Sequence, residues 1–168
     1  MSIDLTKIKM FIMDVDGTLT DGKIYIGNDG EAMKAFNPKD GLGIKLLIKH
    51  DIMPVIITGR TSEIVRRRCQ EIGIQILFQG ITKKAQKVKE LMETYDLQPE
   101  EVCYIGDDLN DLGAMKVAGV SFAPADCAEQ IRPSIDILLT KSAGEGPVRE
   151  AIDMILENRI TAADIEEL

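Results

Sequence analysis

Short, largely apolar runs recur along the chain and predict buried strands. A run that is continuous, with no alternation of polar and apolar residues, is typical of a strand with both faces buried, as in a parallel sheet. Glycine or charged residues bound most of these runs. The predicted strands cover residues 10–13, 54–58, 75–78, 102–105, 119–123 and 135–139.

Amphipathic segments between these runs predict helices. The first begins near Pro38, which suits a first helical turn, and runs to about Lys49. Its apolar positions are Leu42, Leu46, Leu47 and Ile48. Further helices are expected over 109–117 and 147–158. Strands that alternate with helices imply an α/β protein whose parallel sheet is covered on both faces.

Small polar residues mark the expected starts of two other helices. Thr61 and Ser62 predict the cap of a helix that continues to Ile72. Thr82 predicts the cap of a helix that runs to Tyr95. The apolar residues that share one face of this second helix are Val88, Leu91 and Met92.

One segment departs from this alternation of strands and helices. Residues 23–26 and 31–36 alternate in polarity on either side of Gly27-Asn28-Asp29-Gly30, which predicts a β-hairpin over about 22–36. Two strands alone are only marginally stable, and an exposed strand edge needs cover. The hairpin is therefore expected to pack against something else.

Composition limits the classes of partner. The chain has 168 residues, which suits one domain, 1–168, and its net charge of −8 argues against a general binder of nucleic acid or anionic membranes. Cys69, Cys103 and Cys127 are odd in number and far apart, which predicts reduced thiols. No run reaches the roughly 18 apolar residues of a membrane span, and no signal-peptide core is visible. A cytoplasmic protein is expected, and the sequence assigns no role to the tail 159–168.

The first strand ends at a pair of acids. Asp14-Val15-Asp16-Gly17 follows Met13 directly. Ligands of open α/β sheets bind beyond the carboxyl ends of the strands, so two carboxylates there predict a divalent-cation site or a nucleophile that attacks phosphorus. An ordinary Asp-Gly turn is the alternative interpretation.

Polar residues follow two other strands and begin a helix. Thr58 and Gly59 offer a hydroxyl and backbone N–H groups to an anion, although Thr58 alone also suits a helix cap. Lys84 opposes the dipole at a helix start, so either an anion nearby or solvent exposure explains it. The acids Asp107, Asp108 and Asp111 need a cation among them, or they form an ordinary acidic helix N-terminus.

Together, DVDGTLTDG, Thr58, Lys84 and GDDLND resemble the four ordered motifs of the haloacid dehalogenase superfamily. The resemblance implies a doubly wound, Rossmann-like parallel sheet. It also implies that Asp14 is the nucleophile and Asp16 the general acid/base. Mg²⁺ would be held by Asp14, the backbone carbonyl of Asp16, and Asp107. Phosphoryl oxygens would be bound by Thr58, Gly59 and Lys84, with Asp108 and Asp111 in support.

A narrower resemblance covers about residues 8–150. The strings KAFNPKDGLGIK, ITGR, RRRCQEIGI, FQG, YIGDDLND and SAGEGPVRE are similar to those of 3-deoxy-D-manno-octulosonate 8-phosphate (KDO 8-phosphate) phosphatases. This branch serves lipopolysaccharide synthesis. Relatives that act on nine-carbon sugar acids tend to have a glutamate in place of the arginine of ITGR, so the resemblance implies, through Arg60, the eight-carbon substrate. We expect Arg60 and Arg68, eight residues apart, to share a helix face and bind the substrate carboxylate. The alternative for the run 66–68 is a solvated basic face.

Other functions remain possible on the sequence. A phosphatase for a nine-carbon or simpler sugar phosphate would use the same motifs. A signalling receiver domain also uses Asp, Thr, Lys and Mg²⁺, but it places its acidic pair and its phosphate acceptor on different strands. A non-catalytic partner of a sugar-nucleotide enzyme would not need the complete motif set. The only histidine, His50, falls at a predicted helix end, where a surface position is the simplest interpretation.

The spacing of the motifs leaves no room for a cap domain. The interval 17–57 holds only the hairpin and one helix, and 59–83 holds one helix and one strand. An open site would weaken the electrostatic terms of phosphoryl transfer. The resemblance implies a homotetramer, in which hairpins pack together and close neighbouring active sites. It also implies that Gly144-Glu145-Gly146 reaches towards the site, although this segment is equally explained as a loop before the last helix.

Overall fold

The computed structural model describes residues 3–166 and contains a six-stranded parallel sheet. The strands lie in the order β5-β4-β1-β6-β7-β8, with β1 near the centre. All the neighbouring strands of this sheet run parallel. Their bounds are β1 Met10–Met13, β4 Met53–Ile57, β5 Ile76–Phe78, β6 Val102–Ile105, β7 Val120–Ala123 and β8 Ile137–Leu138. The predicted α/β architecture is confirmed.

The register of the sheet brings three chain segments together at one edge. Met13, the last residue of β1, lies opposite Ile56 on β4 and Ile105 on β6. Asp14 and Gly106 therefore leave the sheet side by side, and Thr58 follows one residue later, after Ile57 ends β4. This is the edge at which ligands bind in open α/β sheets.

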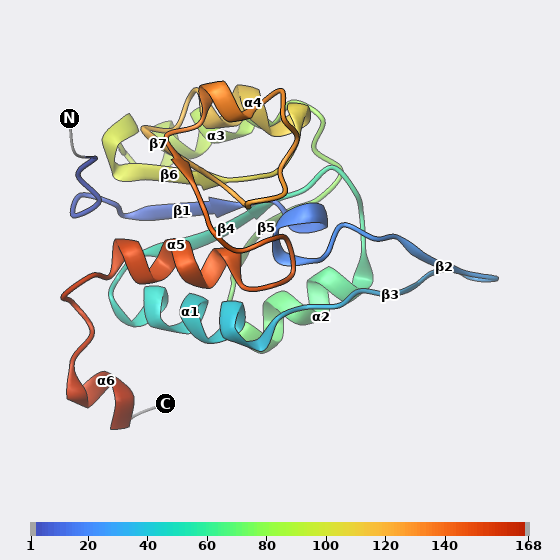
Figure 1. The fold of residues 1–168 in the computed structure, drawn as a ribbon, viewed down its shortest axis with the longest axis horizontal. Coiled ribbons are helices and arrows are strands. Elements are labelled where there is room, and N and C mark those ends of the chain that lie inside the picture. Colours follow the sequence, from blue (N-terminus) through green and yellow to red (C-terminus); the bar gives the residue numbers. More distant parts are fainter. Residues whose placement is uncertain (1–2, 167–168) are drawn as a thin grey trace.

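Helices cover both faces of the sheet, so its strands are apolar on both sides. In Figure 1, α3 and α4 lie above the sheet, and α1, α2 and α5 lie below it. Phe11 and Met13 pack into the lower core, while Met10 and Ile12 pack into the upper one. The helix bounds are α1 Pro38–Lys49, α2 Glu63–Ile72, α3 Lys84–Thr94, α4 Leu109–Met115, α5 Pro147–Ile155 and α6 Ala162–Glu166. Short 3₁₀ turns occupy Pro99–Glu101 and Arg132–Ser134.

Of the five predicted helix starts, four are confirmed, including those of α4 at Leu109 and α5 at Pro147. Asn37 caps α1, because its side chain accepts a hydrogen bond from the Lys39 N–H at 2.9 Å. Ser62 caps α2 through its hydroxyl oxygen. The cap assigned to Thr82 is wrong: α3 begins at Lys84 and has no side-chain cap. The preceding loop positions the lysine at the helix start, so local cap chemistry does not set this boundary.

The expected apolar face of α1 is partly wrong. Leu42 and Ile48 are 37% and 40% exposed, whereas Ile44 is fully buried. Gly43 lies so close to α5 that a Cβ there would be 3.0 Å from the Arg149 side chain. Glycine therefore marks the buried face of α1, because it permits the close packing of the two helices. An analysis of hydrophobic positions alone does not detect this.

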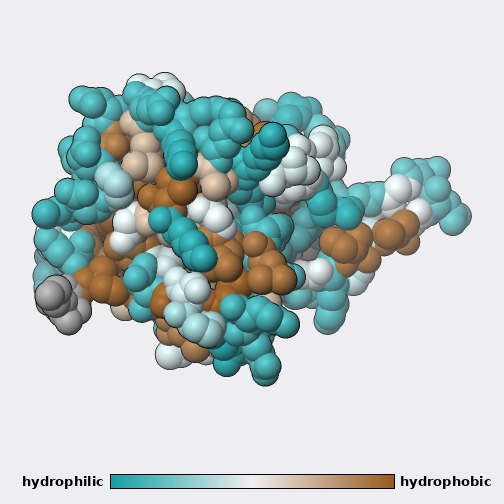
Figure 2. All heavy atoms as spheres, turned by 90° about the horizontal axis from the view of Figure 1, so that it is seen from above, coloured by the Kyte–Doolittle hydropathy of each residue, from teal (hydrophilic) through white to brown (hydrophobic). Residues whose placement is uncertain are grey.

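The predicted hairpin is confirmed as a separate two-stranded sheet of β2 (Tyr25–Gly27) and β3 (Gly30–Met33). Figure 1 shows it projecting beyond the sheet at the edge where β1 ends. Ile26 and Met33 are 76% and 57% exposed. Figure 2 shows hydrophobic side chains along this projection. Among the described residues, no separate cap domain interrupts the fold, as expected.

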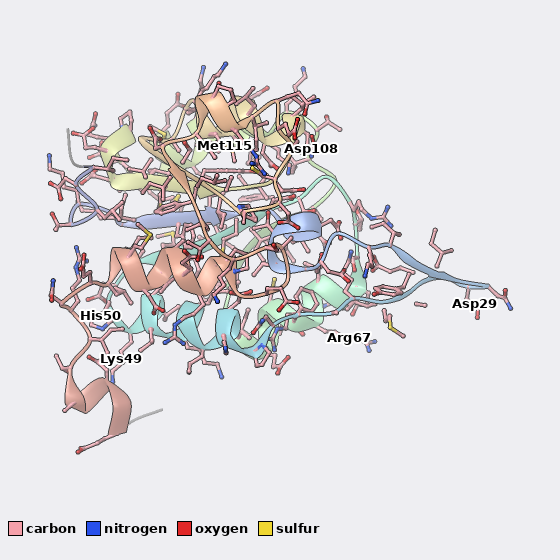
Figure 3. The ribbon with its side chains drawn as sticks, in the orientation of Figure 1. Asp29, Lys49, His50, Arg67, Asp108 and Met115 are labelled. Atoms are coloured by element: carbon pink, nitrogen blue, oxygen red, sulfur yellow. The ribbon has the colours of Figure 1, made fainter. Side chains whose placement is uncertain are left out.

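The C-terminal helix α6 lies far from this edge. Asp164 bridges back to the end of α1, with one carboxylate oxygen 3.1 Å from Lys49 Nζ and the other 3.5 Å from His50 Nε2. Figure 3 shows Lys49 and His50 at the end of the molecule opposite Asp108 and the hairpin. His50 is therefore remote from the predicted chemistry. None of the helices in the described part of the chain has both the length and the apolar character that crossing a bilayer requires.

Candidate active site

A pocket of about 160 Å³ lies where β1, β4 and β6 end. The pocket collects residues from three of the four motifs found in the sequence. Its lining residues are Asp14, Asp16, Thr58, Gly59, Arg60, Asp107, Asp108 and Asn110. Parallel strands with matched register explain this convergence, because each motif directly follows a strand. Asn110 was not expected here, although its place within GDDLND is a signal.

Lys84 reaches the same place from the start of α3. Its ammonium donates hydrogen bonds to Asp14 Oδ1 at 2.8 Å and to Asp111 Oδ1 at 2.7 Å. All three side chains are almost completely buried. Burial alone would lower the pKa of Lys84, but the two carboxylates raise it overall. The buried ammonium is therefore charged, and the interpretation of Lys84 as a solvated surface residue is wrong.

Asp111 holds this cluster together. Its Oδ1 also accepts a hydrogen bond from the Tyr104 hydroxyl at 2.6 Å, and its Oδ2 accepts one from the Asp107 N–H at 3.1 Å. Gly106 leaves room for this arrangement, because a Cβ there would lie 2.4 Å from the Asp111 carboxyl carbon. Tyr104 was not among the residues predicted for the site. A buried tyrosine needs a partner for its hydroxyl, so its place in an apolar strand was the available signal.

Asp107 lies against the turn that carries the first two acids. Gly17 has a φ of +88°, and a Cβ there would be 2.1 Å from Asp107 Oδ2. Glycine at this position therefore permits both the left-handed turn and the close approach of the carboxylate. Burial raises the pKa of Asp107 to about 8, with further contributions from the charges of Asp14 and Asp111. Burial also raises the pKa of Asp14, to about 6, and the negative charge of Asp111 is the second contribution.

The three carboxylates form a group suited to a cation. Ligand atoms of Asp14, Asp107 and Asp111 all lie within 4.8 Å of one another. Both Asp111 oxygens already accept hydrogen bonds from the protein. Asp14 accepts hydrogen bonds from Lys84 and from the Val15 backbone N–H, but Asp14 and Asp107 line the pocket whereas Asp111 does not, so these two are better placed to bind a metal. A divalent cation would relieve the repulsion that raises their pKa values.

Two cationic side chains, those of Lys34 and Arg60, lie near the Asp16 carboxylate. The Lys34 ammonium donates a hydrogen bond to Asp16 Oδ1, and Arg60 Nε lies 3.8 Å from Oδ2. Lys34 belongs to the base of the hairpin, just after β3. Lys34 was not predicted for the site, because nothing in its local sequence distinguishes it from the other lysines of the chain. Asp16 therefore differs from Asp14, which faces the buried Lys84 instead.

Thr58 and Asp108 hold their loops in place. The Thr58 N–H donates to the Phe78 carbonyl at 3.0 Å, and the Thr58 carbonyl accepts from the Ile81 N–H at 3.0 Å. Thr58 lies four residues before the Ser62 cap, so its interpretation as a helix cap is wrong. Asp108 caps α4 through a hydrogen bond from the Leu109 N–H at 2.7 Å. Asp108 thus caps the N-terminus of α4 and also lines the pocket.

The two arginines expected to act together lie in different places. Arg60 lines the pocket, but it precedes α2, which begins at Glu63. The expectation that Arg60 and Arg68 share a helix face is therefore wrong. Arg68 lies over the Phe36 ring at 5.7 Å and is not among the lining residues of its own chain's pocket. The prediction failed because it assumed helical spacing from Arg60 to Arg68, and Arg60 lies before the first residue of α2.

The loop before α5 contacts the turn that follows β1, as expected for a segment that reaches towards the pocket. The Gly144 N–H donates to the Thr18 carbonyl at 3.4 Å, and the Gly144 carbonyl accepts from Asn37 Nδ2 at 3.1 Å. A Cβ at Gly144 would lie 2.8 Å from the Asp21 nitrogen, and its φ is +74°. Glycine therefore allows this loop to pack on the turn that follows β1.

Known proteins are similar to this chain in sequence. Residues 68–152 match the model of the haloacid dehalogenase-like hydrolase family. A 3-deoxy-D-manno-octulosonate 8-phosphate phosphatase from Escherichia coli K12 is 44% identical over 149 residues, which span 89% of this chain and 79% of the relative. The chain belongs to this phosphatase family.

Solved structures of the KDO 8-phosphate phosphatase family share the fold. The cobalt-bound enzyme from Haemophilus influenzae superimposes with a TM-score of 0.91 at 40% identity, covering 96% of this chain and 98% of that one. The enzyme from Moraxella catarrhalis was solved with magnesium ion, phosphate ion and KDO. It superimposes with a TM-score of 0.88 at 40% identity, covering 91% of this chain and 88% of that one. The protein is therefore a hydrolase of phosphoric monoesters with the predicted fold.

Proposed function

We propose that this protein hydrolyses KDO 8-phosphate to KDO and inorganic phosphate, in the synthesis of lipopolysaccharide precursors. The observation that carries the proposal is the buried contact between Lys84 and Asp14 at the pocket. It holds an aspartate, ready to attack phosphorus, beside a fixed positive charge. The relatives whose names specify this substrate support the choice of sugar acid.

Mg²⁺ fits the donor set of the pocket. Asp14, Asp107 and the backbone carbonyl of Asp16 would hold it, because hard cations prefer oxygen ligands. The close acidic cluster supports this assignment, as does the magnesium ion in the Moraxella catarrhalis relative. When bound, the ion would supply positive charge that offsets the charge of the phosphoryl group.

The chain's own residues divide the remaining work. Thr58, the Gly59 backbone and Lys84 bind the phosphoryl oxygens, and Lys84 reduces the repulsion between phosphate and Asp14. The Asp14 carboxylate attacks phosphorus while the bond to the sugar oxygen breaks, and Asp16 gives that oxygen a proton. Water then attacks the phosphorus of the aspartyl phosphate and passes a proton to Asp16. This step releases inorganic phosphate and restores Asp14.

Phosphate release from a set of substrates tests the proposal. The purified protein with Mg²⁺ is given KDO 8-phosphate, a nine-carbon 2-keto sugar acid phosphate, and simple hexose phosphates. We expect the highest kcat/KM for KDO 8-phosphate and no turnover with excess chelator. A higher kcat/KM for the nine-carbon acid would assign the enzyme to that substrate. Absence of turnover on every substrate would contradict a phosphatase.

We infer further that the active enzyme is a homotetramer with sites at subunit boundaries. The hairpin supports this inference, since Ile24, Ile26 and Met33 are exposed on a sheet of only two strands. Burial of these side chains between subunits would also narrow the open pocket. Analytical ultracentrifugation, with activity measured at the same dilution, tests it. A monomer with full specific activity would contradict the inference.

Residues 1–168 are proposed to form one domain, with residues 22–36 as its flap, because the six main strands share one sheet. The free, buried thiols of Cys69, Cys103 and Cys127 support a place in the reducing cytoplasm. Limited proteolysis tests the domain proposal, and cell fractionation tests the location. Cleavage into two stable fragments would contradict a single domain.

A further inference from the structure

Lys34 is a buried cation that the catalytic scheme above does not use. Its side chain is only 2% exposed, although it belongs to the base of a projecting hairpin. Lysine is almost never buried without a partner. Lys34 has two: its ammonium donates to Asp16 Oδ1 and lies 3.0 Å from Glu31 Oε1.

Glu31 connects this lysine to the main body of the protein. Its second oxygen, Oε2, accepts a hydrogen bond from the Ser62 hydroxyl, and Ser62 caps α2. Arg60 Nη2 lies 3.9 Å from Glu31 Oε1. A continuous set of polar contacts therefore runs from the start of α2 through Glu31 and Lys34 to the carboxylate of Asp16.

The two oxygens of Asp16 consequently have different surroundings. Oδ1 is occupied by the Lys34 ammonium, whereas Oδ2 faces Arg60 at the longer distance of 3.8 Å. A carboxylate held through one oxygen presents the other in a fixed direction. Such precision affects catalysis, because a misplacement of about 1 Å costs on the order of a hundredfold in rate.

We infer that Lys34 is a positioning residue, which orients the Asp16 carboxylate towards the sugar oxygen that leaves, and that Glu31 and Ser62 hold Lys34 in place. The inference rests on the proposed phosphatase function and adds a role for the hairpin within its own subunit. Lys34 contacts no phosphorus and transfers no proton. Its effect should be greatest where the leaving oxygen most needs a proton.

The dependence of rate on the leaving group tests this role. KDO 8-phosphate releases an alkoxide that needs protonation, whereas p-nitrophenolate departs with little help. For Lys34→Met, which keeps the chain length but not the charge, kcat/KM should fall about thirtyfold to a hundredfold on KDO 8-phosphate. On p-nitrophenyl phosphate the fall should be about threefold or less. Glu31→Gln should show the same selective pattern with a smaller loss, and Lys34→Arg should restore part of the activity.

Lys23→Met is the matched control, since Lys23 is on the same hairpin segment but its side chain is 73% exposed. It should leave both substrates unchanged. Equal losses on both substrates in Lys34→Met, or a lower melting temperature with unchanged kcat/KM, would overturn the inference and leave Lys34 as a structural anchor.

A series of aryl phosphates separates this result from the proposed function. If the wild type fails on KDO 8-phosphate but hydrolyses aryl phosphates, the proposed substrate is wrong. The positioning role is then decided by whether Lys34→Met makes kcat/KM more sensitive to the leaving-group pKa. Unchanged sensitivity overturns the inference, and a wild type without any phosphatase activity overturns both.

Discussion

The Lys84 ammonium donates a hydrogen bond to Asp14 Oδ1 across 2.8 Å, although the two residues lie 70 positions apart in the chain. The fold buries both groups, so neither is stabilised by water. Each carries the charge that the other requires. This contact ties the start of α3 to the end of β1 and sets the electrostatic character of the pocket.

Lys84→Met should reduce both activity and stability. Loss of a fixed donor to the phosphoryl group typically lowers kcat about a hundredfold to a thousandfold. The variant also leaves Asp14 and Asp111 facing each other without a cation, which should cost about 3 to 5 kcal/mol of unfolding free energy at neutral pH. Steady-state kinetics and chemical denaturation measure the two effects. Lys89→Met, an exposed position on the same helix, is the control, and a kcat within about threefold of wild type would contradict the role of Lys84.

Asp14→Asn should abolish turnover, because an amide is a poor nucleophile and a neutral metal ligand. Asp16→Asn should slow turnover by about a hundredfold or more, the usual scale for loss of a general acid/base. Phosphate release by the purified variants measures both. Unchanged melting temperatures would show that the variants fold. Activity close to wild type in either one would refute its assigned role.

Mg²⁺ should stabilise the protein more at pH 8.5 than at pH 5.5. The pKa values of Asp14 and Asp107 are raised to about 6 and about 8. A raised carboxyl pKa contributes stability that is present at low pH and lost as pH rises through the folded-state value. Without a divalent ion, the free energy of unfolding should therefore fall from about pH 4, near the ordinary carboxyl pKa, up to about pH 8, the raised pKa of Asp107. Melting curves with Mg²⁺ or with chelator measure this effect. If Mg²⁺ raised the melting temperature equally at both pH values, the result would count against a metal site at Asp14 and Asp107.

Asp40→Asn should stabilise the protein at neutral pH. Asp40 Oδ1 accepts a hydrogen bond from the Arg149 N–H at 2.7 Å, while the buried Oδ2 has no hydrogen-bond partner within residues 3–166. Burial raises the pKa of Asp40 to about 6, so its charge becomes unfavourable to folding as pH rises through that value. Asparagine keeps the acceptor and removes the charge, for a gain of up to about 3 kcal/mol at pH 7.5 and little at pH 4.

Denaturation in saturating Mg²⁺ isolates this effect of Asp40 from those of the metal-site acids. Asp153→Asn provides the control, because Asp153 is 50% exposed on α5 and pairs with the same arginine, Arg149. It should change stability by about 1 kcal/mol or less. If Asp40→Asn leaves the dependence of stability on pH unchanged, Asp40 is not the source of that dependence.

Arg60→Ala and Arg68→Ala should have different effects. Arg60 lines the pocket, so its loss should lower kcat/KM for the sugar acid phosphate much more than for p-nitrophenyl phosphate. Arg68 packs over Phe36 and pairs with Glu71 at 2.9 Å, so its loss should mainly lower the melting temperature. Kinetics on both substrates, measured at one protein concentration for all variants, decides this. A substrate-selective loss in Arg68→Ala would show that it reaches a sugar site.

Patterns that are local in the chain were sufficient for much of this protein. Apolar runs located all six strands of the main sheet, and the hairpin was recognised from its turn and alternation. Motifs that directly follow strands, such as Asp14 after β1 and Asp107 after β6, were correctly brought together. The reason is geometric: parallel strands end at a common edge, so the order of motifs along the chain already implies their convergence.

Tertiary structure alone decided the contacts that depend on packing between distant segments. The close approach of α5 sets the buried face of α1. The burial of Lys84 goes with the start of α3 at that residue. Arg60 and Arg68 are separated because α2 begins only at Glu63. Tyr104 and Lys34 acquired their partners in the same way. A charged or hydroxyl group looks the same in sequence whether it is solvated or buried. Only the folded chain shows which groups have lost water and must therefore bind one another.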